Sequence, residues 1–255
     1  MLKVLLVGNS HLAALKAGWE AYPKRPSWSI QFYGSPGISM EGLRHRKDGS
    51  IVAGEPRLSK KMLSLWGSDE VRPDDFDFIF VAGLAPGAFA FANDYVKMNG
   101  VPNSNDELRG AARQLVSRSL AAGTVATLRQ VTGRPIIVIE TPGPSSDRFP
   151  DEKALSSIVV NNARAFSDAL LWGLQKMDGV DDALRQPDET KVFDIFTKPE
   201  YSRGSVRLSS KSIEHSDFDS KHMNGDFGVK VIQEIDRSIS GGRYGIYSPA
   251  RSVSM

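Results

Sequence analysis

The chain has 255 residues, which suits one large α/β domain or two small ones and is enough to bury a sizeable core. Its formal net charge of +2 gives no overall field for nucleic acid or a membrane surface. It has no cysteine, which excludes disulfides, thiolate nucleophiles and cysteine-bound metals. No apolar run approaches the ~20 residues of a membrane span, and Met1 leads almost directly into an apolar segment, leaving no room for a signal peptide. We therefore expect a cytoplasmic protein.

The first apolar segment, residues 3–7, is predicted to be a buried parallel strand because it is rich in Val and Leu and alternates little. Apolar residues then recur at helical spacing from Leu12 to Tyr22, which predicts a helix. Residues 28–33 alternate as a second strand, which ends in the turn Gly34-Ser35-Pro36-Gly37.

Residues 38–73 follow an irregular pattern and are predicted to leave the sheet. Within them, the dipeptide Asp48-Gly49 between two short apolar runs indicates a hairpin. Residues 57–66 are predicted to form a short helix. We expect this excursion to carry no strand of the main sheet.

A third buried strand is predicted at 77–82, where Gly83 ends it. The segment 84–104, with two Pro and two Gly residues, is typical of a loop. A long helix is expected from about 107 to 132, because apolar positions recur through it at helical spacing. Residues 135–141 then predict a fourth strand.

The last third of the chain is predicted to contain a helix at 151–177, a fifth strand at 191–196 and a polar loop at 197–218. Apolar spacing between Phe227 and Ile235 predicts a terminal helix. Five strands that alternate with helices predict a parallel sheet covered on both faces. We therefore expect one domain, residues 1–237, and a flexible tail, residues 238–255.

The candidate catalytic residues lie near the two ends of the chain. Ser10 follows the first strand in Gly8-Asn9-Ser10, and His222 comes just before the terminal helix. Asp219 lies three residues before His222, a spacing that lets a carboxylate reach back to the imidazole and hold its tautomer. Ser10 and His222 both precede helices, so both are expected at the carboxyl edge of the sheet, where ligands bind in open α/β folds.

Each of these signals has a structural alternative. A serine just before an amphipathic helix is usually an N-cap. Asp219 or Asn224 could likewise simply cap the last helix and have no catalytic role. The Asp, Glu and His residues show no spacing that is typical of metal ligands, so we predict no metal. The first turn also lacks the second and third glycines of a dinucleotide site, which excludes that class.

Taken together, the motifs resemble those of the SGNH (GDSL-type) hydrolases. Gly8-Asn9-Ser10 resembles the family's first block, and Asp219-x-x-His222-x-Asn224-x-x-x-Gly228 resembles its last. Gly37, after the second strand, and Gly83, after the third, match glycines of the two middle blocks. The resemblance extends from residue 4 to about residue 236.

The resemblance implies a flavodoxin-like, three-layer α/β/α fold with a five-stranded parallel sheet in the order 2-1-3-4-5. Ser10 would be the nucleophile, His222 the base and then the acid, and Asp219 the residue that orients His222. The backbone N–H groups of Ser10 and Gly37 would form the oxyanion hole. No cofactor is implied.

Two positions depart from the family pattern. Asn9 stands where the family usually has Asp, and Ala85 stands where it places an oxyanion Asn. Asn93-Asp94 has suitable side chains but lies ten residues past Gly83, too far for the same turn. Possible substrate-binding residues are predicted as a set: His11, Gly83, Ala85 and Asn224.

Three functions agree with these features. The first is a serine esterase that hydrolyses a small, acetyl-like ester, with a small molecule or a carbohydrate as substrate. The second is an O-acyltransferase that uses the same Ser-His-Asp site. The third is a non-catalytic glycan-binding module on a degenerate hydrolase fold, which the alanine at position 85 favours. No nucleic acid partner and no membrane span are expected.

Overall fold

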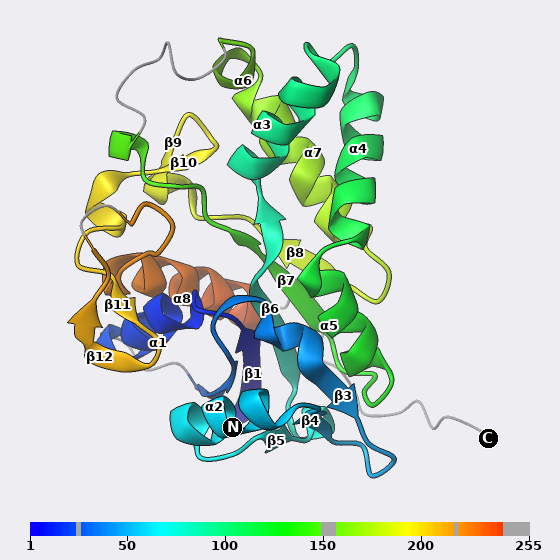
Figure 1. The fold of residues 1–255 in the computed structure, drawn as a ribbon, viewed down its shortest axis with the longest axis vertical. Coiled ribbons are helices and arrows are strands. Elements are labelled where there is room, and N and C mark those ends of the chain that lie inside the picture. The colour runs from blue at the N-terminus through cyan, green and yellow to red at the C-terminus, as the bar shows by residue number, and fades with distance from the viewer. Residues whose placement is uncertain (24–26, 149–156, 217–218, 242–255) are drawn as a thin grey trace.

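Five parallel strands form the central sheet, in the order β2-β1-β6-β7-β8 (Figure 1). The computed structural model describes residues 1–23, 27–148, 157–216 and 219–241. The bounds of the sheet strands are Leu2–Gly8 for β1, Trp28–Gly34 for β2, Phe78–Gly87 for β6, Ile136–Thr141 for β7 and Asp182–Leu184 for β8. Renumbered within the sheet, this order is 2-1-3-4-5, so the predicted flavodoxin-like order is confirmed.

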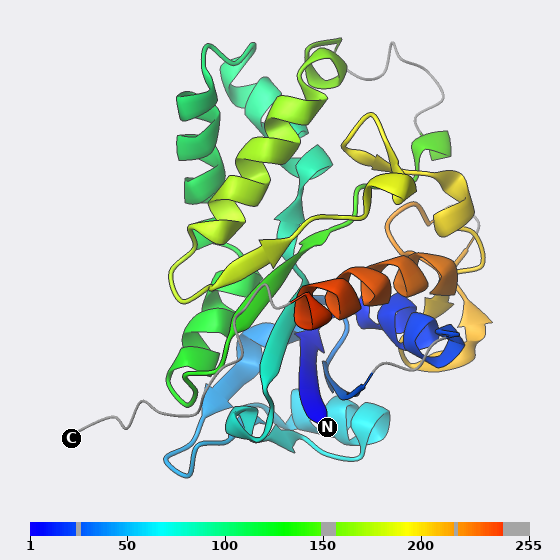
Figure 2. The same cartoon turned by 180° about the vertical axis from the view of Figure 1, so that it is seen from behind.

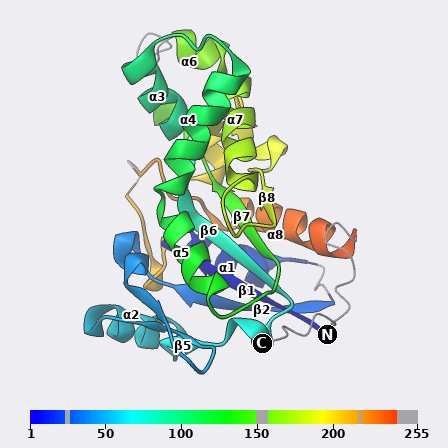
Figure 3. The same cartoon turned by 90° about the vertical axis from the view of Figure 1, so that its right-hand side faces the viewer.

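Helices cover both faces of the sheet, because successive side chains of each strand point to opposite faces. Val4 and Leu6 of β1 belong to the core under α1 (Leu12–Ala21) and α8 (Gly225–Ser240). Leu5 and Val7 belong to the core on the other face. Its helices are α3 (Ala88–Asn99), α4 (Asn105–Ser117), α5 (Leu120–Arg129) and α7 (Ala163–Gln175). Figure 3 shows α5 and α8 on opposite sides of the sheet.

Helices α1 and α8 cross at a direct backbone contact. A Cβ atom on Gly228 would lie 1.8 Å from the carbonyl oxygen of Ala14, and one on Gly18 would lie 2.2 Å from the carbonyl carbon of Gly228. Only glycine fits at these two positions. This contact fixes the start of α8 against α1, and therefore the segment before α8 against the first turn.

The predicted excursion from the sheet forms a small antiparallel sheet of its own, in the order β3-β4-β5. Strands β3 (Leu43–His45) and β4 (Ile51–Ala53) form the predicted hairpin. Helix α2 (Pro56–Trp66) confirms the predicted short helix. The other elements of this region are η1 (Gly37–Gly42), β5 (Glu70–Val71) and η2 (Pro73–Asp75).

Two predictions in the middle of the chain were wrong. Residues 84–104 are not a loop, because β6 continues to Gly87 and α3 follows it directly. The long helix expected at 107–132 is divided into α4 and α5 at Arg118 and Ser119. The Ser119 hydroxyl accepts from the backbone N–H of Ala122, so it caps a new helix where the apolar spacing continues without a break.

The fifth strand of the sheet was also predicted at the wrong place. It is β8, whereas residues 191–197 form a short antiparallel ribbon of β9 (Lys191–Val192) and β10 (Phe196–Thr197). Phe193 and Asp194 turn the chain between them at φ values of 49° and 58°. The helix expected at 151–177 is present as α6 (Ser157–Asn161) and α7, while 151–156 lie outside the described residues.

The predicted polar loop at 197–218 contains a short helix and a hairpin. These are η5 (Pro199–Tyr201), β11 (Val206–Arg207) and β12 (Ser210–Glu214), which lie beside α1 and α8 (Figure 2). Two further short helices are η3 (Ser146–Arg148) and η4 (Asp188–Thr190). The terminal helix α8 continues to Ser240, and 242–255 of the expected tail lie outside the described residues. Within the described ranges, no helix is both long and apolar enough to cross a lipid bilayer.

Candidate active site

The first turn is held by Asn9 rather than by Ser10. The Asn9 side chain accepts from the backbone N–H of His11 at 3.1 Å and donates to the carbonyl oxygen of Gly83. The N-cap position of α1 is His11, whose side chain makes no capping hydrogen bond. Ser10 therefore sits in the turn after β1 with its hydroxyl directed to a partner outside α1.

That partner is His222, at the other end of the chain. Ser10 Oγ lies 2.9 Å from His222 Nε2, and His222 Nδ1 lies 2.7 Å from Asp219 Oδ2. The Asp219 carboxylate can only accept, so His222 Nδ1 carries the proton and Nε2 accepts from the Ser10 hydroxyl. The structure thus brings together the three residues that the sequence singled out as a possible triad.

The Asp219 carboxylate is held in its ionised form. Burial raises its pKa, but the hydrogen bonds from the His222 ring and from the backbone N–H groups of Lys221 and His222 outweigh burial and lower the pKa to about 2. Both backbone donors bind Oδ1, at 2.9 and 3.0 Å. Asp219 is therefore a fixed negative charge beside His222 at any pH near neutrality.

A residue that the sequence analysis did not single out, His215, lies against the same pair. Its ring stacks on the His222 ring with centroids 3.9 Å apart and planes 5° apart, and its Nδ1 lies 3.1 Å from Asp219 Oδ2. The His11 ring lies farther from His222, with the two ring centroids 5.7 Å apart. The only sequence signal for His215 was its four-residue spacing from Asp219.

Burial disfavours the protonated forms of His11 and His215. Burial and the nearby His222 lower the pKa of His11 to about 4. Burial and His222 also lower the pKa of His215. Two neutral imidazoles thus surround the one that contacts Ser10.

His215, Asp219 and His222 also have the atom types of a metal site, with ligand atoms within 4.8 Å of one another. The lone pairs of an imidazole lie in the plane of its ring. Because the His215 and His222 rings are parallel, their Nδ1 lone pairs do not converge on one point. Asp219 Oδ2 instead accepts from His222 Nδ1, and His215 Nδ1 lies 3.1 Å from the same oxygen.

Two of the predicted binding residues, Gly83 and Ala85, lie in the second half of β6, where the register with β7 shifts between Ala82 and Gly87. Gly83 has φ of +71°, and a Cβ atom there would lie 2.3 Å from Asn9 Oδ1 and 2.7 Å from His11 Cδ2. Ala85 is buried in the core, and its carbonyl oxygen accepts from the Thr141 hydroxyl at 2.6 Å. The methyl side chain of Ala85 offers no donor for an oxyanion.

Gly37 begins η1 beside the end of β1, where the N–H of Ser35 donates to the carbonyl oxygen of Gly8 at 3.2 Å. Its φ is +72°, and no heavy atom lies within 4 Å of the place that a Cβ would take. Gly37 therefore faces open space at the same sheet edge as Ser10, which is where a substrate would approach. Its role as an oxyanion donor, together with the N–H of Ser10, stays a prediction.

Asn224, also predicted as a possible binding residue, has a structural role. It is the N-cap of α8, where its Oδ1 accepts from the N–H of Phe227 at 3.1 Å. Its Nδ2 donates to the carbonyl oxygens of Glu200 and Arg203, at 2.7 and 2.9 Å. With both amide hydrogens engaged, Asn224 ties η5 to the start of α8 and so positions the segment that carries His222.

A second link holds this segment to the sheet. The N–H of Ser145, in the loop after β7, donates to the carbonyl oxygen of Ser220 at 2.8 Å. The same loop is bound by the buried side chain of Gln186, which accepts from the N–H of Gly143 at 3.1 Å and donates to the Thr197 hydroxyl at 3.0 Å. This polar network positions the backbone next to Asp219.

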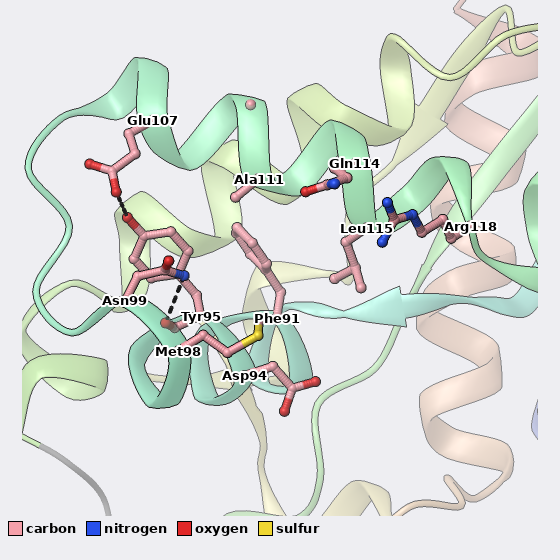
Figure 4. A pocket seen from close by; sticks show the side chains of 11 residues that line it. Phe91, Asp94, Tyr95, Met98, Asn99, Glu107, Ala111, Gln114, Leu115 and Arg118 are labelled. Atoms are coloured by element: carbon pink, nitrogen blue, oxygen red, sulfur yellow. Dashed lines mark hydrogen bonds between the residues drawn. The ribbon is translucent and has the colours of Figure 1, made fainter.

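Two further cavities help to define the limits of the site. A polar cavity of about 340 Å³ adjoins it, lined in part by Asp219, His215, Asp147 and Arg203. Another, of about 510 Å³, lies between α3 and α4, where Phe91 and the hydrogen-bonded pair Tyr95 and Glu107 line it (Figure 4). None of the triad candidates lines the second cavity, so it is not part of the candidate site.

The sheet order and the contact between Ser10, His222 and Asp219 agree with the resemblance to the SGNH hydrolases, and the predicted fold type is confirmed. No protein-family model and no curated protein matches the sequence.

Among solved structures, the chain is similar to the periplasmic domain of a lipopolysaccharide acetyltransferase from Salmonella ser. Paratyphi A, with TM-score 0.45, 11% identity and coverage of 93% of this chain and 83% of that chain. It is also similar to Est24, a carbohydrate acetylesterase from Sinorhizobium meliloti, with TM-score 0.40, 12% identity and coverage of 94% and 99%. An extracellular lipase from Streptomyces rimosus gives TM-score 0.44, 12% identity and coverage of 93% and 99%. Similarities at this level identify neither a reaction nor a substrate for this chain.

Proposed function

We propose that this protein is a serine esterase that hydrolyses a small acyl ester through an acyl-serine intermediate. The observation that carries the proposal is the continuous contact from Ser10 Oγ to His222 Nε2 at 2.9 Å and from His222 Nδ1 to Asp219 at 2.7 Å. A serine hydroxyl is a weak nucleophile unless a base takes its proton, and a neutral imidazole oriented by a carboxylate is suited to that task.

In the first half of the reaction, Ser10 Oγ attacks the ester carbonyl carbon while its proton passes to His222 Nε2. The negative charge of Asp219 stabilises the resulting imidazolium. The backbone N–H groups of Ser10 and Gly37 are proposed to donate to the oxyanion. His222 then gives the proton to the leaving alcohol oxygen, and the acyl group remains on Ser10.

In the second half, His222 Nε2 takes a proton from water, whose oxygen attacks the acyl carbon. The bond to Ser10 Oγ breaks, and Ser10 regains its proton from His222 as the carboxylic acid leaves. Ala85 cannot supply a side-chain donor, so we expect an oxyanion hole of two backbone groups. Loss of one donor costs about 10²–10³ in rate in other hydrolases, so a modest turnover is expected.

Crowding on one side of Ser10 supports a small acyl group. The Asn9 side chain and the His11 ring fill the corner at Gly83 so closely that even a Cβ atom would lie 2.3 Å from Asn9 Oδ1. An acetyl group needs little space there, whereas a long chain would have to leave by the open side at Gly37.

The polar cavity beside Asp219 supports a hydroxyl-rich alcohol such as a carbohydrate. Besides His215 and Asp219, its lining carries hydroxyl and charged groups from Asp147, Arg203 and several serines. Charged and hydroxyl side chains that line one cavity can bind sugar hydroxyls through hydrogen bonds. We propose an O-acetylated sugar as the substrate class.

The test is hydrolysis of p-nitrophenyl acetate and of an acetylated monosaccharide by the purified chain and by Ser10→Ala. We expect turnover of both by the wild-type chain and of neither by the variant. Added sugar acceptors and product analysis separate hydrolysis from acyl transfer, which begins from the same intermediate. Absence of Ser10-dependent turnover on all short-chain esters would contradict the proposal.

A further inference from the structure

A cavity of about 540 Å³ begins at the residue next to Gly37, on the open side of the candidate site. It lies between α2 and the hairpin of β11 and β12, which are on the same side of the molecule in Figure 1. We call this cavity the basic groove. The residues that line it with a charged, hydroxyl or proline side chain are Pro36, Arg57, Lys60, Lys61, Ser64 and Ser209. Its volume is within the range of ligand-binding pockets.

The three cations of the basic groove come from one face of α2. Lys60 and Lys61 follow Arg57 by three and four residues, a spacing that places side chains next to one another on a helix, and all three are exposed. Like charges at this spacing destabilise a helix, so folding does not account for them. The net charge of the whole chain is only +2, so general basicity does not account for them either.

The positive charge of the basic groove is not offset by carboxylates. Among the described residues that line it, none is acidic. In the described part of the chain, none of the three cations forms an ion pair. The cavity beside Asp219 and the cavity between α3 and α4 both contain carboxylates, so this property is not shared by the cavities in general.

The acidic residues that flank α2 in the chain have other neighbours. Glu55 lies beside Gly42, where a Cβ atom would be 3.8 Å from Glu55 Cγ. Asp69 accepts from the Ser59 hydroxyl. An anionic ligand in the basic groove would therefore meet cations and hydroxyl groups without competition from these two carboxylates.

Helix α2 is held at both ends of the turn that leads to Gly37. Lys61 Nζ donates to the hydroxyl of Ser39 at 3.4 Å, two residues beyond Gly37. At the C-terminal end of α2, Trp66 Nε1 donates to the carbonyl oxygen of Gly34 at 2.6 Å. The cations of the basic groove therefore lie at a fixed place relative to the proposed oxyanion donor.

The hairpin of β11 and β12 connects the basic groove to the candidate site. Ser209, in the turn of the hairpin, lines the basic groove, whereas Ser205 and His215, at its other end, line the polar cavity beside Asp219. The N–H of His215 donates to the carbonyl oxygen of Ser205 at 2.8 Å and closes that end. From Ser209 to His215 an extended strand covers at most about 20 Å. An oligosaccharide that lies along the hairpin can occupy both cavities, whereas a monosaccharide cannot.

We propose that the basic groove binds an anionic group of the substrate, so that the substrate class is an O-acetylated acidic oligosaccharide. Its acetylated residue lies at Ser10, and another residue of the same oligosaccharide places a carboxylate or a phosphate against Arg57, Lys60 and Lys61. Guanidinium and ammonium groups bind both kinds of anion through charge-assisted hydrogen bonds. This inference rests on the proposed function for its rate measurements, but its binding measurements need no catalysis.

Three oligosaccharides of equal length test the proposal: an O-acetylated oligogalacturonide, its carboxyl-reduced neutral counterpart, and that neutral counterpart with one phosphate monoester. Release of acetate gives kcat and KM for each. The groove variant carries three substitutions that remove the cations, Arg57→Gln, Lys60→Gln and Lys61→Gln. All three side chains are exposed, so we expect the variant to fold.

The matched control removes the same charges from other exposed positions. Its substitutions are on α3, on α4 and at the end of α7, and they are Lys97→Gln, Arg113→Gln and Lys176→Gln. Both variants lower the net charge by three, from +2 to −1. A difference between them therefore reports where the charges lie and not how many there are.

For the wild-type chain we expect kcat/KM to be about 10-fold higher for an acidic oligosaccharide than for the neutral one, as three exposed charge pairs would give. In the groove variant this ratio should fall to near 1, mainly through KM, because the anionic group is remote from the ester. The control variant should keep the wild-type ratio. In the wild-type chain, 1 M salt should also abolish the preference, since it screens charges beyond about 3 Å. The acidic oligosaccharide that is preferred identifies the anion as carboxylate or phosphate.

Binding of the unacetylated oligosaccharides provides the independent test. In ¹⁵N NMR titrations, the acidic ones should shift the amide signals of α2 and Ser209, and their Kd should rise about 10-fold in the groove variant but not in the control. Equal binding of acidic and neutral oligosaccharides, or equal losses in the two variants, would overturn the proposal. Binding of anionic lipid vesicles through these cations without binding of any oligosaccharide would also overturn it. If the acidic oligosaccharide binds in the groove and no ester is hydrolysed, this inference holds and the proposed function fails. If esters are hydrolysed through Ser10 without preference for an acidic substrate, the proposed function holds and this inference fails.

Discussion

The two sides of the candidate site are built by different means. On the strand side, Ser10 follows β1 in a turn bonded to Gly83, where the Asn9 and His11 side chains pack so closely that no Cβ fits. On the loop side, Asp219 and His222 lie outside the sheet and are held by hydrogen bonds from polar groups such as Asn224 and Ser145. The nucleophile is thus positioned by packing against the sheet, and the base by a polar network.

The largest expected effect is the loss of the nucleophile itself. Ser10→Ala should lower kcat by about 10⁶, as loss of the nucleophile does in another serine hydrolase. Its stability should not fall, because the turn is bonded through Asn9. Assays of ester hydrolysis measure kcat, and urea unfolding measures stability. Ser117→Ala on α4 is the control. A variant that keeps measurable Ser10-independent turnover would place the reaction elsewhere.

Gly83→Ala should break the strand side and lower both stability and activity. A non-glycine residue at φ of +71° costs about 1–3 kcal/mol, and the displaced Asn9 adds to that cost. Gly110→Ala is the matched control: it lies in α4 with no heavy atom within 4 Å of the added Cβ, so it should stabilise by up to about 1 kcal/mol. Thermal unfolding of both variants compares their stabilities. Equal stability of the two would show that the Gly83 corner is not tightly packed.

Asn224→Ala should weaken the loop side alone. It removes the cap of α8 and the bonds to Glu200 and Arg203, with an expected loss of about 1–2 kcal/mol and a fall in kcat as His222 loses its position. Ser104→Ala removes a comparable cap from α4, far from the site, and should reduce stability without a change in kcat. If both variants lowered stability and neither changed kcat, Asn224 would cap α8 without positioning the site.

The smallest expected effect is a dependence of stability on pH. Burial next to His222 lowers the pKa of His11 from 6.5 to about 4, so between these values the unfolded chain binds a proton at His11 that the folded chain does not. Stability should therefore fall as the pH drops from about 6.5 to about 4, and His11→Gln should flatten this slope. Urea midpoints at several pH values, with His45→Gln as the control, measure it. An unchanged slope in His11→Gln would contradict the expected burial of His11.

Much of the strand side could be predicted from the sequence. The apolar pattern located β1, β2, β6 and β7, and the resemblance to the SGNH hydrolases implied the order of the sheet. Ser10 and Gly37 each follow a strand within a few residues. The sequence pattern did not predict elements that are very short or whose first residues favour another structure. Strand β8 has only three residues, and α3 begins directly after Pro86-Gly87, which is typical of a loop.

The loop side could be predicted only in part. Asp219 and His222 are three residues apart, so a single turn can bring them together and their contact could be predicted from the sequence. The stacking of His215 on His222 depends on tertiary contacts, which include the bonds of Asn224 to η5 and of Ser145 to Ser220. Such contacts join segments that no periodicity relates, so sequence patterns could not reveal them.

The most direct test of the account is covalent labelling of the nucleophile. The wild-type chain is incubated with a fluorophosphonate, and intact mass and peptide mapping locate the adduct. The account predicts a single adduct on Ser10, formed far more slowly in His222→Ala and Asp219→Asn, since an oriented base activates the hydroxyl. An adduct at another serine, or no adduct on a folded chain, would contradict the assignment of Ser10 as the nucleophile.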